Sequence, residues 1–338
     1  MSSPTKPKIL LLGKIEHPAS QAAFQSLSSL ATIIHPTSTS PSSFLTECRS
    51  GSFSGILAVY RTFDSVSITG RIAGPVVSAL ASTGCRFIAH NGAGYDQISI
   101  PECTANGIQV SNVPGVVDAA TADTALFLLL GALRMFNAPL QSLRVGEWRG
   151  KEQRLGRDPE GKVLGVLGMG GIGSEVARRA GGLGMRVWYH NRRRVGEGRE
   201  GGAEYKGFEE LLGGVDVLSV NVPLNPSTRH LISTPQFEMM KTGVVIVNTA
   251  RGPIIDEAAL VAALDSGKVA SAGLDVYEEE PKVHPGLVAN PHVMLLPHMG
   301  TSTYETQEKM ELHVVENVRS ALEKGELVSL VPEQRGGG

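Results

Sequence analysis

A glycine-rich turn between an apolar strand and a helix constrains the fold of this chain most. Residues 162–168, Lys-Val-Leu-Gly-Val-Leu-Gly, form a near-continuous apolar run, which is typical of a strand covered on both faces. Gly168-Met-Gly170-Gly-Ile-Gly173 follows at once, and residues 174–183 then predict a helix. The first glycine permits a tight turn, the second lets a ligand approach the backbone, and the third lets helix and strand pack closely. The helix N-terminus after such a turn favours an anion.

The same alternation of strands and helices extends along the chain. Short apolar runs bounded by Gly, Pro or polar residues predict strands, and helical stretches lie between them. The predicted strands are 8–12, 31–35, 55–60, 85–90, 162–168, 185–189, 215–220, 243–248, 271–274 and 293–296; the predicted helices include 20–30, 72–82, 116–136, 174–183 and 305–324. Residues 36–43, rich in Ser, Thr and Pro, are interpreted as a surface loop. This pattern predicts an α/β fold of parallel βαβ units.

Composition restricts the class of protein. The chain is 41% hydrophobic and 19% charged, as in globular proteins, and its formal net charge of -2 gives no reason to expect nucleic acid as a partner. The apolar run 9–12 is too short for a signal-peptide core or a membrane span, so no membrane is expected. Cys48, Cys85 and Cys103 are odd in number and lack metal-ligand spacing. We therefore expect no metal and a reducing, cytoplasmic location.

The glycine loop predicts a dinucleotide site, and the next strand end indicates which dinucleotide. An acid about 20 residues after the loop would bind the ribose 2′-hydroxyl of NAD. Asn191 stands there instead, and Arg192, Arg193 and Arg194 follow it. With no carboxylate to repel a 2′-phosphate, and guanidinium groups to bind one, the sequence favours NADP(H), with NAD(H) as the alternative cofactor. A solvated basic turn is the other interpretation of the arginines.

Three polar residues downstream carry complementary chemistry. Arg251 lies in Val-Asn-Thr-Ala-Arg-Gly-Pro, Glu280 ends the run Tyr-Glu-Glu-Glu before a proline, and His298 follows Leu-Leu-Pro. Arginine offers a planar fork suited to a carboxylate, histidine can exchange a proton near neutral pH, and a carboxylate can orient that histidine. Structural roles are the alternatives, such as an Arg251–Asp256 ion pair or solvated positions for the other two.

Several segments in this order resemble the D-isomer-specific 2-hydroxyacid dehydrogenases, and most of all the glyoxylate/hydroxypyruvate reductase branch with its fungal mandelate-dehydrogenase-like relatives. The matching segments are 91–96 (Asn-Gly-Ala-Gly-Tyr-Asp), 168–173, 222–224 (Val-Pro-Leu), 248–256, 274–281 and 297–300. The resemblance implies reduction of a small 2-oxo acid, such as glyoxylate, hydroxypyruvate or a bulkier 2-keto acid, to the D-2-hydroxy acid. One departure is Asn221, where the family often has His before Val-Pro.

The resemblance also implies residue roles. Arg251 would bind the substrate carboxylate and polarise its carbonyl, His298 would donate the proton, and Glu280 would hydrogen-bond His298. The backbone N–H groups of Ala93 and Gly94 would hold the carboxylate. Arg61, after a strand end, either faces the substrate or lies on the surface. The cofactor contacts implied are Gly168, Gly170, Gly171, Ile172, Gly173, Asn191, Arg192, Arg193, Val222, Pro223, Thr228, Thr249, Ala250 and Asp275.

The architecture expected is two Rossmann/flavodoxin-like parallel-sheet domains with a cleft between them. Residues 1–112, completed by 304–338, would form the flavodoxin-like substrate domain, and residues 113–303 the Rossmann dinucleotide-binding domain. The resemblance implies a homodimer. Trp148 belongs to a segment resembling the family's dimerisation or active-site border, although a partly buried structural tryptophan is the favoured interpretation.

Two other classes of protein remain as alternatives. A formate or phosphite dehydrogenase shares the fold, but formate dehydrogenases pair the active histidine with glutamine, and Glu280 argues against that. A nicotinamide-sensing corepressor or scaffold retains a similar set of three residues, so those residues alone do not exclude it. Turnover of a 2-oxo acid would separate the enzyme from the scaffold.

Overall fold

The computed structural model describes residues 6–150, 154–196, 198 and 200–335, and the chain folds as two compact units. Unit 1 comprises Met1–Val116 and Thr303–Gly338, and unit 2 comprises Val117–Ser302. The boundaries expected from the sequence lie after residues 112 and 303. Each unit contains one parallel sheet covered by helices, so the predicted α/β class with two parallel-sheet domains is confirmed.

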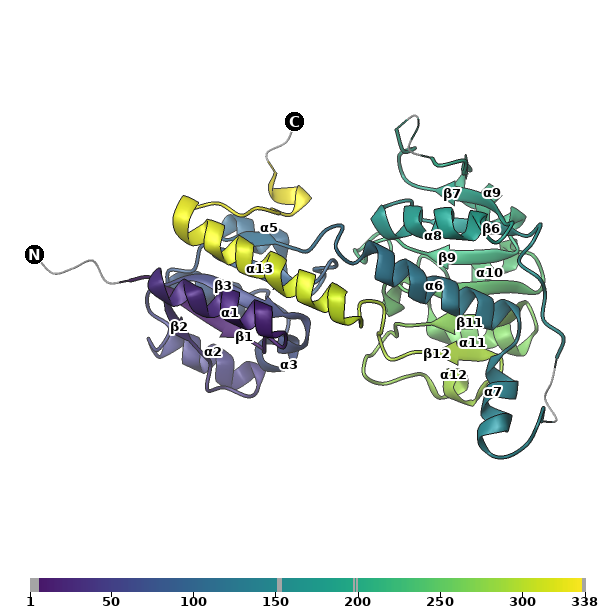
Figure 1. Ribbon diagram of the computed structural model, residues 1–338, viewed down its shortest axis with the longest axis horizontal. Coiled ribbons are helices and arrows are strands. Elements are labelled where there is room, and N and C mark those ends of the chain that lie inside the picture. Colours follow the sequence, from purple (N-terminus) through teal and green to yellow (C-terminus); the bar gives the residue numbers. More distant parts are fainter. Residues whose placement is uncertain (1–5, 151–153, 197, 199, 336–338) are drawn as a thin grey trace, which may run out of the picture. The chain divides into compact units, whose positions relative to one another are not determined.

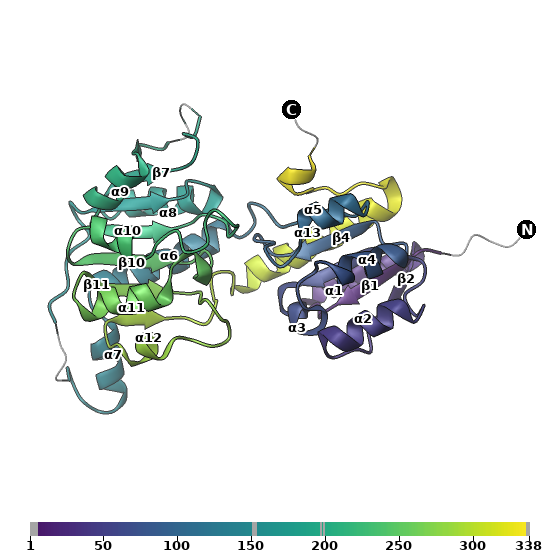
Figure 2. The same ribbon diagram turned by 180° about the vertical axis from the view of Figure 1, so that it is seen from behind.

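Unit 1 is built on a five-stranded parallel sheet in the order β2-β1-β3-β4-β5. The strands are β1 (Lys8–Leu12), β2 (Thr32–Ile34), β3 (Ile56–Thr62), β4 (Phe87–Asn91) and β5 (Gln109–Ser111). The α-helices are α1 (Pro18–Ser26), α2 (Pro41–Arg49), α3 (Val66–Thr69), α4 (Pro75–Ser82), α5 (Ile100–Ala105) and α13 (Tyr304–Lys324). Helices α1 and α13 lie together on one face of this sheet, and α2, α4 and α5 cover the other (Figures 1 and 2).

Unit 2 is built on a seven-stranded parallel sheet in the order β12-β11-β10-β9-β6-β7-β8. The strands are β6 (Val163–Leu167), β7 (Arg186–His190), β8 (Glu204–Tyr205), β9 (Val217–Val220), β10 (Val244–Asn248), β11 (Val269–Leu274) and β12 (Val293–Leu295). The α-helices are α6 (Asp118–Leu133), α7 (Asn137–Arg144), α8 (Gly171–Gly181), α9 (Phe208–Gly214), α10 (Thr234–Met239), α11 (Glu257–Asp265) and α12 (Pro285–Ala289). Strands β6, β9 and β10 are buried along their whole length, which explains their continuous apolar sequences.

Two apolar clusters cover the faces of the unit 2 sheet. Helices α6 and α8 supply one cluster, and α9, α10, α11 and α12 supply the other (Figures 1 and 2). Among the described residues, no single helix is long and apolar enough to cross a bilayer; the sharply bent pair α6 and α7 meets the criteria together, by length and composition alone.

The structure corrects three predictions of local structure. The loop expected over 36–43 is interrupted at Pro41, where α2 begins, because Ser40 caps the helix and exchanges hydrogen bonds with Ser43. The helix expected over 72–82 begins only at Pro75, the first position that proline favours. The helix expected over 20–30 begins and ends earlier, as α1, and continues as a short 3-10 turn at Leu27–Ser29.

Candidate active site

Three neighbouring strands of unit 2 bring the predicted catalytic residues to one edge of the sheet. Strands β10, β11 and β12 are adjacent and parallel, so their carboxyl ends meet at the same edge. Arg251 follows β10, Glu280 lies in the loop after β11, and His298 follows β12. Ligands of open α/β sheets bind at this edge.

His298 and Glu280 form a direct pair. His298 Nδ1 lies 2.8 Å from Glu280 Oε2, and the backbone N–H of Tyr277 donates to Glu280 Oε1 at 3.0 Å. Burial opposes ionisation of Glu280, but the hydrogen bond and charge of His298, the Tyr277 N–H and the charge of Arg251 outweigh it, so the pKa of Glu280 is lowered. Glu280 is therefore a carboxylate that accepts from the Nδ1–H of His298, and this hydrogen bond orients the imidazole ring.

Arg251 is held by the buried end of β10. Asn248, 1% exposed, donates from Nδ2 to the Arg251 carbonyl at 2.9 Å and accepts from the Ala250 N–H at 3.0 Å. The guanidinium donates from Nη1 to the Ala250 carbonyl at 2.7 Å. Asp256, the structural partner considered for Arg251, caps α11 by accepting from the Ala259 N–H. Asn248 lies inside the segment quoted from the sequence, but its role in holding the turn was not predicted.

The loop that carries Arg251 packs directly on the loop that carries Glu280. Gly252 permits this contact, because a Cβ atom there would lie 1.8 Å from the carbonyl carbon of Tyr277 and 2.4 Å from the backbone nitrogen of Glu278. Any side chain at position 252 would push the two loops apart. The arginine and the carboxylate are therefore placed by backbone contact between their loops.

Asp275 holds the turn that presents His298. Its two carboxylate oxygens accept from the N–H groups of Met299 (2.6 Å) and Gly300 (2.8 Å), and its carbonyl accepts from the His298 N–H (2.8 Å). His298 adopts a left-handed backbone conformation with φ 57°, which a non-glycine residue rarely adopts. Burial raises the pKa of Asp275 against these hydrogen bonds. The sequence predicted Asp275 as a cofactor contact, and the structure adds this role in orienting the histidine turn.

The glycine loop has the geometry of a dinucleotide-binding turn. Gly168 has φ +103°, and a Cβ atom there would lie 2.7 Å from the carbonyl carbon of Asn221. A Cβ atom at Gly173 would lie 2.0 Å from the Gly168 carbonyl oxygen, so this glycine allows the close packing expected from the sequence. No heavy atom outside its immediate chain neighbours lies within 4 Å of a Cβ atom built at Gly170 in the described structure. This open side is where a pyrophosphate could approach.

Polar atoms around the loop fit a nicotinamide dinucleotide. Asn221 Oδ1 and Thr249 Oγ1 are buried at the carboxyl ends of β9 and β10, and neither has a hydrogen-bond partner within the described residues. Buried polar atoms without a protein partner need another one, such as a water, an ion or a polar group of a bound ligand. Thr228, by contrast, donates its hydroxyl to the Pro223 carbonyl at 2.7 Å, so its predicted cofactor contact remains a prediction.

The residues after β7 differ from one another in their contacts. Asn191 accepts from the Met169 N–H at 2.7 Å and so holds the glycine loop. Arg194 pairs with Glu200, whereas Arg192 and Arg193 are exposed and form no ion pair within the described chain. The two arginines adjacent to Asn191 are thus the ones available to a 2′-phosphate.

Asp118 is an acid near the glycine loop that the sequence did not single out. A Cβ atom at Gly171, the first residue of α8, would lie 1.9 Å from Asp118 Oδ2. Burial and the negative charge of Glu175 raise the pKa of Asp118. Its nearness depends on the packing of α6 against α8, which no local sequence signal reveals.

The predicted substrate residues of unit 1 lie at the ends of β3 and β4. Arg61 is 0% exposed, donates to His90 Nδ1 (2.9 Å) and Gln97 Oε1 (2.7 Å), and so is not a surface arginine. Burial lowers its pKa to about 10, and the charge of Asp96 opposes this. His90, neutral because it accepts at Nδ1, donates from Nε2 to the Gly94 carbonyl at 3.1 Å. Arg61 therefore supports the loop 91–96, and a direct contact with substrate stays a prediction.

The same loop exposes donors of the predicted kind. Asn112 donates to the Ala93 carbonyl at 2.8 Å, so the carbonyls of both Ala93 and Gly94 are engaged. Their N–H groups form no hydrogen bond within the described residues. The loop is thus oriented so that two adjacent backbone donors are engaged by no described residue.

Trp148 contradicts the favoured interpretation from the sequence. Its side chain is 78% exposed, so it is not a partly buried structural tryptophan. It follows α7, a short helix that was not predicted and that also leaves apolar side chains exposed.

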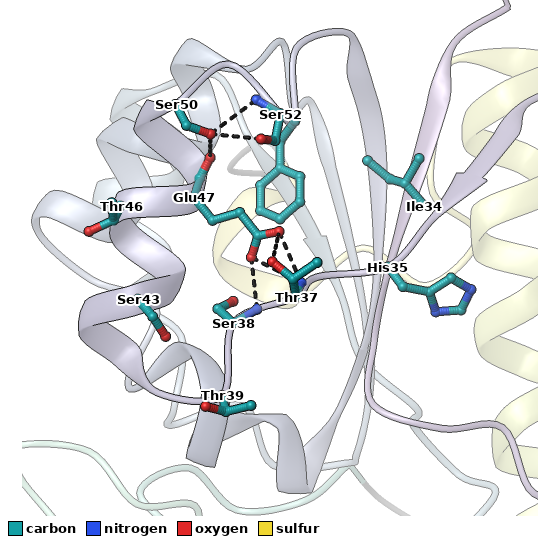
Figure 3. A pocket seen from close by; sticks show the side chains of 11 residues that line it. Ile34, His35, Thr37, Ser38, Thr39, Ser43, Thr46, Glu47, Ser50 and Ser52 are labelled. Carbon is teal, nitrogen blue, oxygen red and sulfur yellow. Dashed lines mark hydrogen bonds between the residues drawn. The ribbon is translucent and has the colours of Figure 1, made fainter.

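A hollow in unit 1 has different chemistry. It lies between α2 and the segment after β2, and hydroxyl side chains line it (Figure 3). The carboxylate of Glu47 accepts from the N–H and hydroxyl of Thr37 and from the N–H of Ser38, so it is already engaged. This hollow therefore brings together none of the predicted site residues. Within the described residues, no group of three or more His, Cys, Asp or Glu side chains could hold a metal ion.

Comparison with known proteins identifies the family. Residues 126–300 match the model of the D-isomer specific 2-hydroxyacid dehydrogenase NAD-binding domain. The chain is 53% identical over 329 residues to 4-methyl-2-oxopentanoate reductase A of Aspergillus oryzae, covering 97% of this chain and 99% of that protein. The protein belongs to the D-isomer specific 2-hydroxyacid dehydrogenase family and is an oxidoreductase.

Two solved structures are also similar over nearly the whole chain. A glyoxylate reductase from Paecilomyes thermophila has a TM-score of 0.94 and 52% identity, covering 98% of this chain and 100% of that one. The NADPH-dependent glyoxylate/hydroxypyruvate reductase of Sinorhizobium meliloti, in complex with NADP and malonate, has a TM-score of 0.84 and 31% identity, covering 97% and 98%. The family resemblance drawn from the sequence is thus confirmed, and the matched domain is one that binds a nicotinamide dinucleotide.

Proposed function

We propose that this protein is an NADPH-dependent reductase that converts small 2-oxo acids to D-2-hydroxy acids, with Arg251 binding the carboxylate and His298 donating the proton. The observation that carries the proposal is the His298–Glu280 pair, whose Nδ1 and Oε2 atoms lie 2.8 Å apart, with the Glu280 loop packed against the Arg251 loop at Gly252. The names of the relatives, reductases of 4-methyl-2-oxopentanoate, glyoxylate and hydroxypyruvate, support the substrate class.

In the proposed reaction, Arg251, His298 and Glu280 each have a separate role. Arg251 binds the substrate carboxylate through two parallel N–H donors and so fixes the orientation of the adjacent ketone. A bound reduced nicotinamide would supply the hydride. Protonated His298 then gives its Nε2 proton to the ketone oxygen, while Glu280 keeps the ring oriented from Nδ1. In the opposite direction neutral Nε2 accepts the hydroxyl proton.

NADP(H) is proposed as the preferred cofactor. Asn191 takes the position of the acid that would repel a 2′-phosphate, and its side chain is committed to the Met169 N–H. Exposed Arg192 and Arg193 follow directly, and the Sinorhizobium meliloti relative is described as NADPH-dependent. NAD(H) is the alternative cofactor.

Initial rates with a panel of 2-oxo acids test the proposal. Glyoxylate, hydroxypyruvate, 4-methyl-2-oxopentanoate and phenylglyoxylate would each be assayed with NADPH and with NADH. His298→Ala and Arg251→Ala should each lower kcat/KM about 100-fold or more, because proton transfer alone contributes roughly 10²–10⁴. Failure of every 2-oxo acid, with cofactor still bound, would favour the corepressor-like alternative, and turnover of formate or phosphite the other dehydrogenases.

We further propose a homodimer that covers α7. Large apolar side chains are exposed along this helix and after it, as patches at protein interfaces are: Phe136, Leu140, Leu143, Val145, Trp148 and Leu155. Leu140→Glu with Leu143→Glu, on one face of the helix, should yield monomers in light scattering. A cytoplasmic location is proposed from the buried free thiols of Cys48, Cys85 and Cys103, and subcellular fractionation would test it.

A further inference from the structure

Glu257 is a buried acid that the proposed mechanism does not use. It is 7% exposed and forms the first residue of α11. Its Oε1 accepts from the Glu278 N–H at 2.8 Å, and its own N–H donates to Glu278 Oε2 at 3.3 Å. The start of α11 and the loop after β11 thus exchange two hydrogen bonds, each from a backbone N–H to a carboxylate. We call this reciprocal pair the Glu257–Glu278 clamp.

The clamp places two carboxylates side by side, which is unfavourable in itself. Burial and the charge of Glu278 raise the pKa of Glu257, against the N–H groups of Glu278 and His284 and the charge of His284. His230 Nε2 hydrogen-bonds Glu278 Oε1; Asp256, the N-cap of α11, adjoins Glu257, and Glu279 and Glu280 follow Glu278 in its loop. Glu257 is buried, whereas the Glu278 side chain is 22% exposed, and placing their like charges near each other costs free energy. In spite of this cost, the two hydrogen bonds fix the backbone of the loop after β11 against the start of α11.

The clamp lies next to both catalytic loops. Glu278 adjoins Tyr277, whose N–H donates to Glu280, and the same Tyr277–Glu278 backbone contacts Gly252 beside Arg251. Tyr277 is also anchored through its hydroxyl, which donates to the Leu296 carbonyl at 2.9 Å, just before the His298 turn. A shift of the Glu278 backbone would therefore move the acceptor of His298 and the support of Arg251 together.

We propose that Glu257 is a positioning residue of the reductase, acting through the Glu278 backbone to hold Glu280 against His298. This inference rests on the proposed function, because it assigns Glu257 a part in the proton-transfer step of that reaction. Glu257 itself touches neither the substrate nor His298 in this assignment.

A double-mutant cycle on the full-length protein tests the inference. Glu257→Ala should lower kcat/KM for 2-oxo acid reduction about tenfold or more, since small displacements of reacting groups have effects up to about 100-fold. The alkaline limb of the pH profile should move to lower pH, as in Glu280→Gln. In a Glu280→Ala background, which removes the contact with His298 itself, Glu257→Ala should not move the limb further, because its effect on His298 acts through Glu280. Glu257→Gln keeps an oxygen that can accept from the Glu278 N–H, so this variant should retain most of the wild-type kcat/KM.

The controls separate positioning from folding and from the proposed function. Glu209→Ala removes an exposed acid from the first turn of α9 and should leave rate and pH limb unchanged. Faster hydrogen exchange of the Glu278 amide in Glu257→Ala would show the clamp directly. Should Glu257→Ala not fold, Glu257→Asp carries the same test with a shortened side chain. Additive effects of the substitutions at positions 257 and 280, or an alkaline limb that stays in place in Glu257→Ala, would overturn the positioning role of Glu257. A fully active His298→Ala would instead overturn the proposed function itself.

Discussion

Under the proposed mechanism, replacing Glu280 by glutamine should shift the pH dependence of 2-oxo acid reduction to lower pH. Glutamine has nearly the same shape and can still accept a hydrogen bond from Nδ1–H of His298, so the substitution removes only the negative charge. A carboxylate attracts the positively charged imidazolium, and the variant lacks this attraction. Reduction needs the protonated ring, so the alkaline limb of kcat/KM should fall at lower pH in the variant.

The distance and exposure of the pair set the size of the shift. Two unit charges 2.8 Å apart interact by about 1.5 kcal/mol at the dielectric constant of water. The side chains are 32% and 30% exposed, so this solvent-screened value applies better than that for a dry interior. Since 1.36 kcal/mol corresponds to about one pH unit, the limb should move by at least about one unit.

Profiles of kcat/KM against pH for wild type, Glu280→Gln and Glu279→Gln provide the measurement. Glu279 is exposed and adjacent, so its substitution removes one negative charge without touching the pair. Oxidation of the hydroxy acid needs the neutral ring, and its rising limb should move in the same direction. A limb that stays in place in Glu280→Gln, or moves equally in Glu279→Gln, would refute the assignment of Glu280 as the partner that tunes the acid.

Three further outcomes are expected. Asn191→Asp, or Arg192→Ala with Arg193→Ala, should abolish a preference for NADPH while NADH use changes little; a wild type that prefers NADH in steady-state rates would contradict the cofactor proposal. Gly252→Ala places a methyl group on the Tyr277 carbonyl, so kcat/KM should fall about 100-fold; unchanged kinetics would show that the loops do not need this contact. Arg61→Met removes the hydrogen-bond donor of His90 Nδ1 and Gln97 Oε1, so it should lower the free energy of unfolding of unit 1 by about 1–3 kcal/mol in urea. An unchanged unfolding midpoint and slope would argue against the buried network.

The sequence predicted the strands of unit 2 well because burial on both faces leaves a long apolar signature. The start of α2 was missed because Ser40 and Pro41 are typical of loops as well as of helix N-termini, and only the Ser43 partner distinguishes them. Helix α7 was missed for a related reason. Its apolar side chains are exposed, so it lacks the buried stripe that marks most helices.

The candidate site was predictable only residue by residue. Arg251, Glu280 and His298 were predicted from their motifs. Their common position at one sheet edge follows from the adjacency of β10, β11 and β12, which no local sequence pattern predicts. Arg61 shows the same limit. A strand-end arginine is compatible with a ligand site or the surface, and its burial against His90 arises from the pairing of β3 with β4.

The polar residues of the candidate site divide into partly exposed residues that are proposed to act in the reaction and buried residues that hold their loops. Asn248, Asp275 and Glu257 are each at most 7% exposed, and each fixes backbone beside a different catalytic side chain. Arg251, Glu280 and His298 keep partial solvent access, which substrate exchange and proton transfer require. Burying a polar side chain is tolerable when its hydrogen bonds are satisfied, and here the partners are backbone N–H or carbonyl groups that the loops would otherwise leave unpaired. Each buried residue thus supplies a hydrogen-bond partner to a turn and positions a neighbouring loop, which explains why polar residues such as Asn248 and Asp275 stand at the ends of apolar strands.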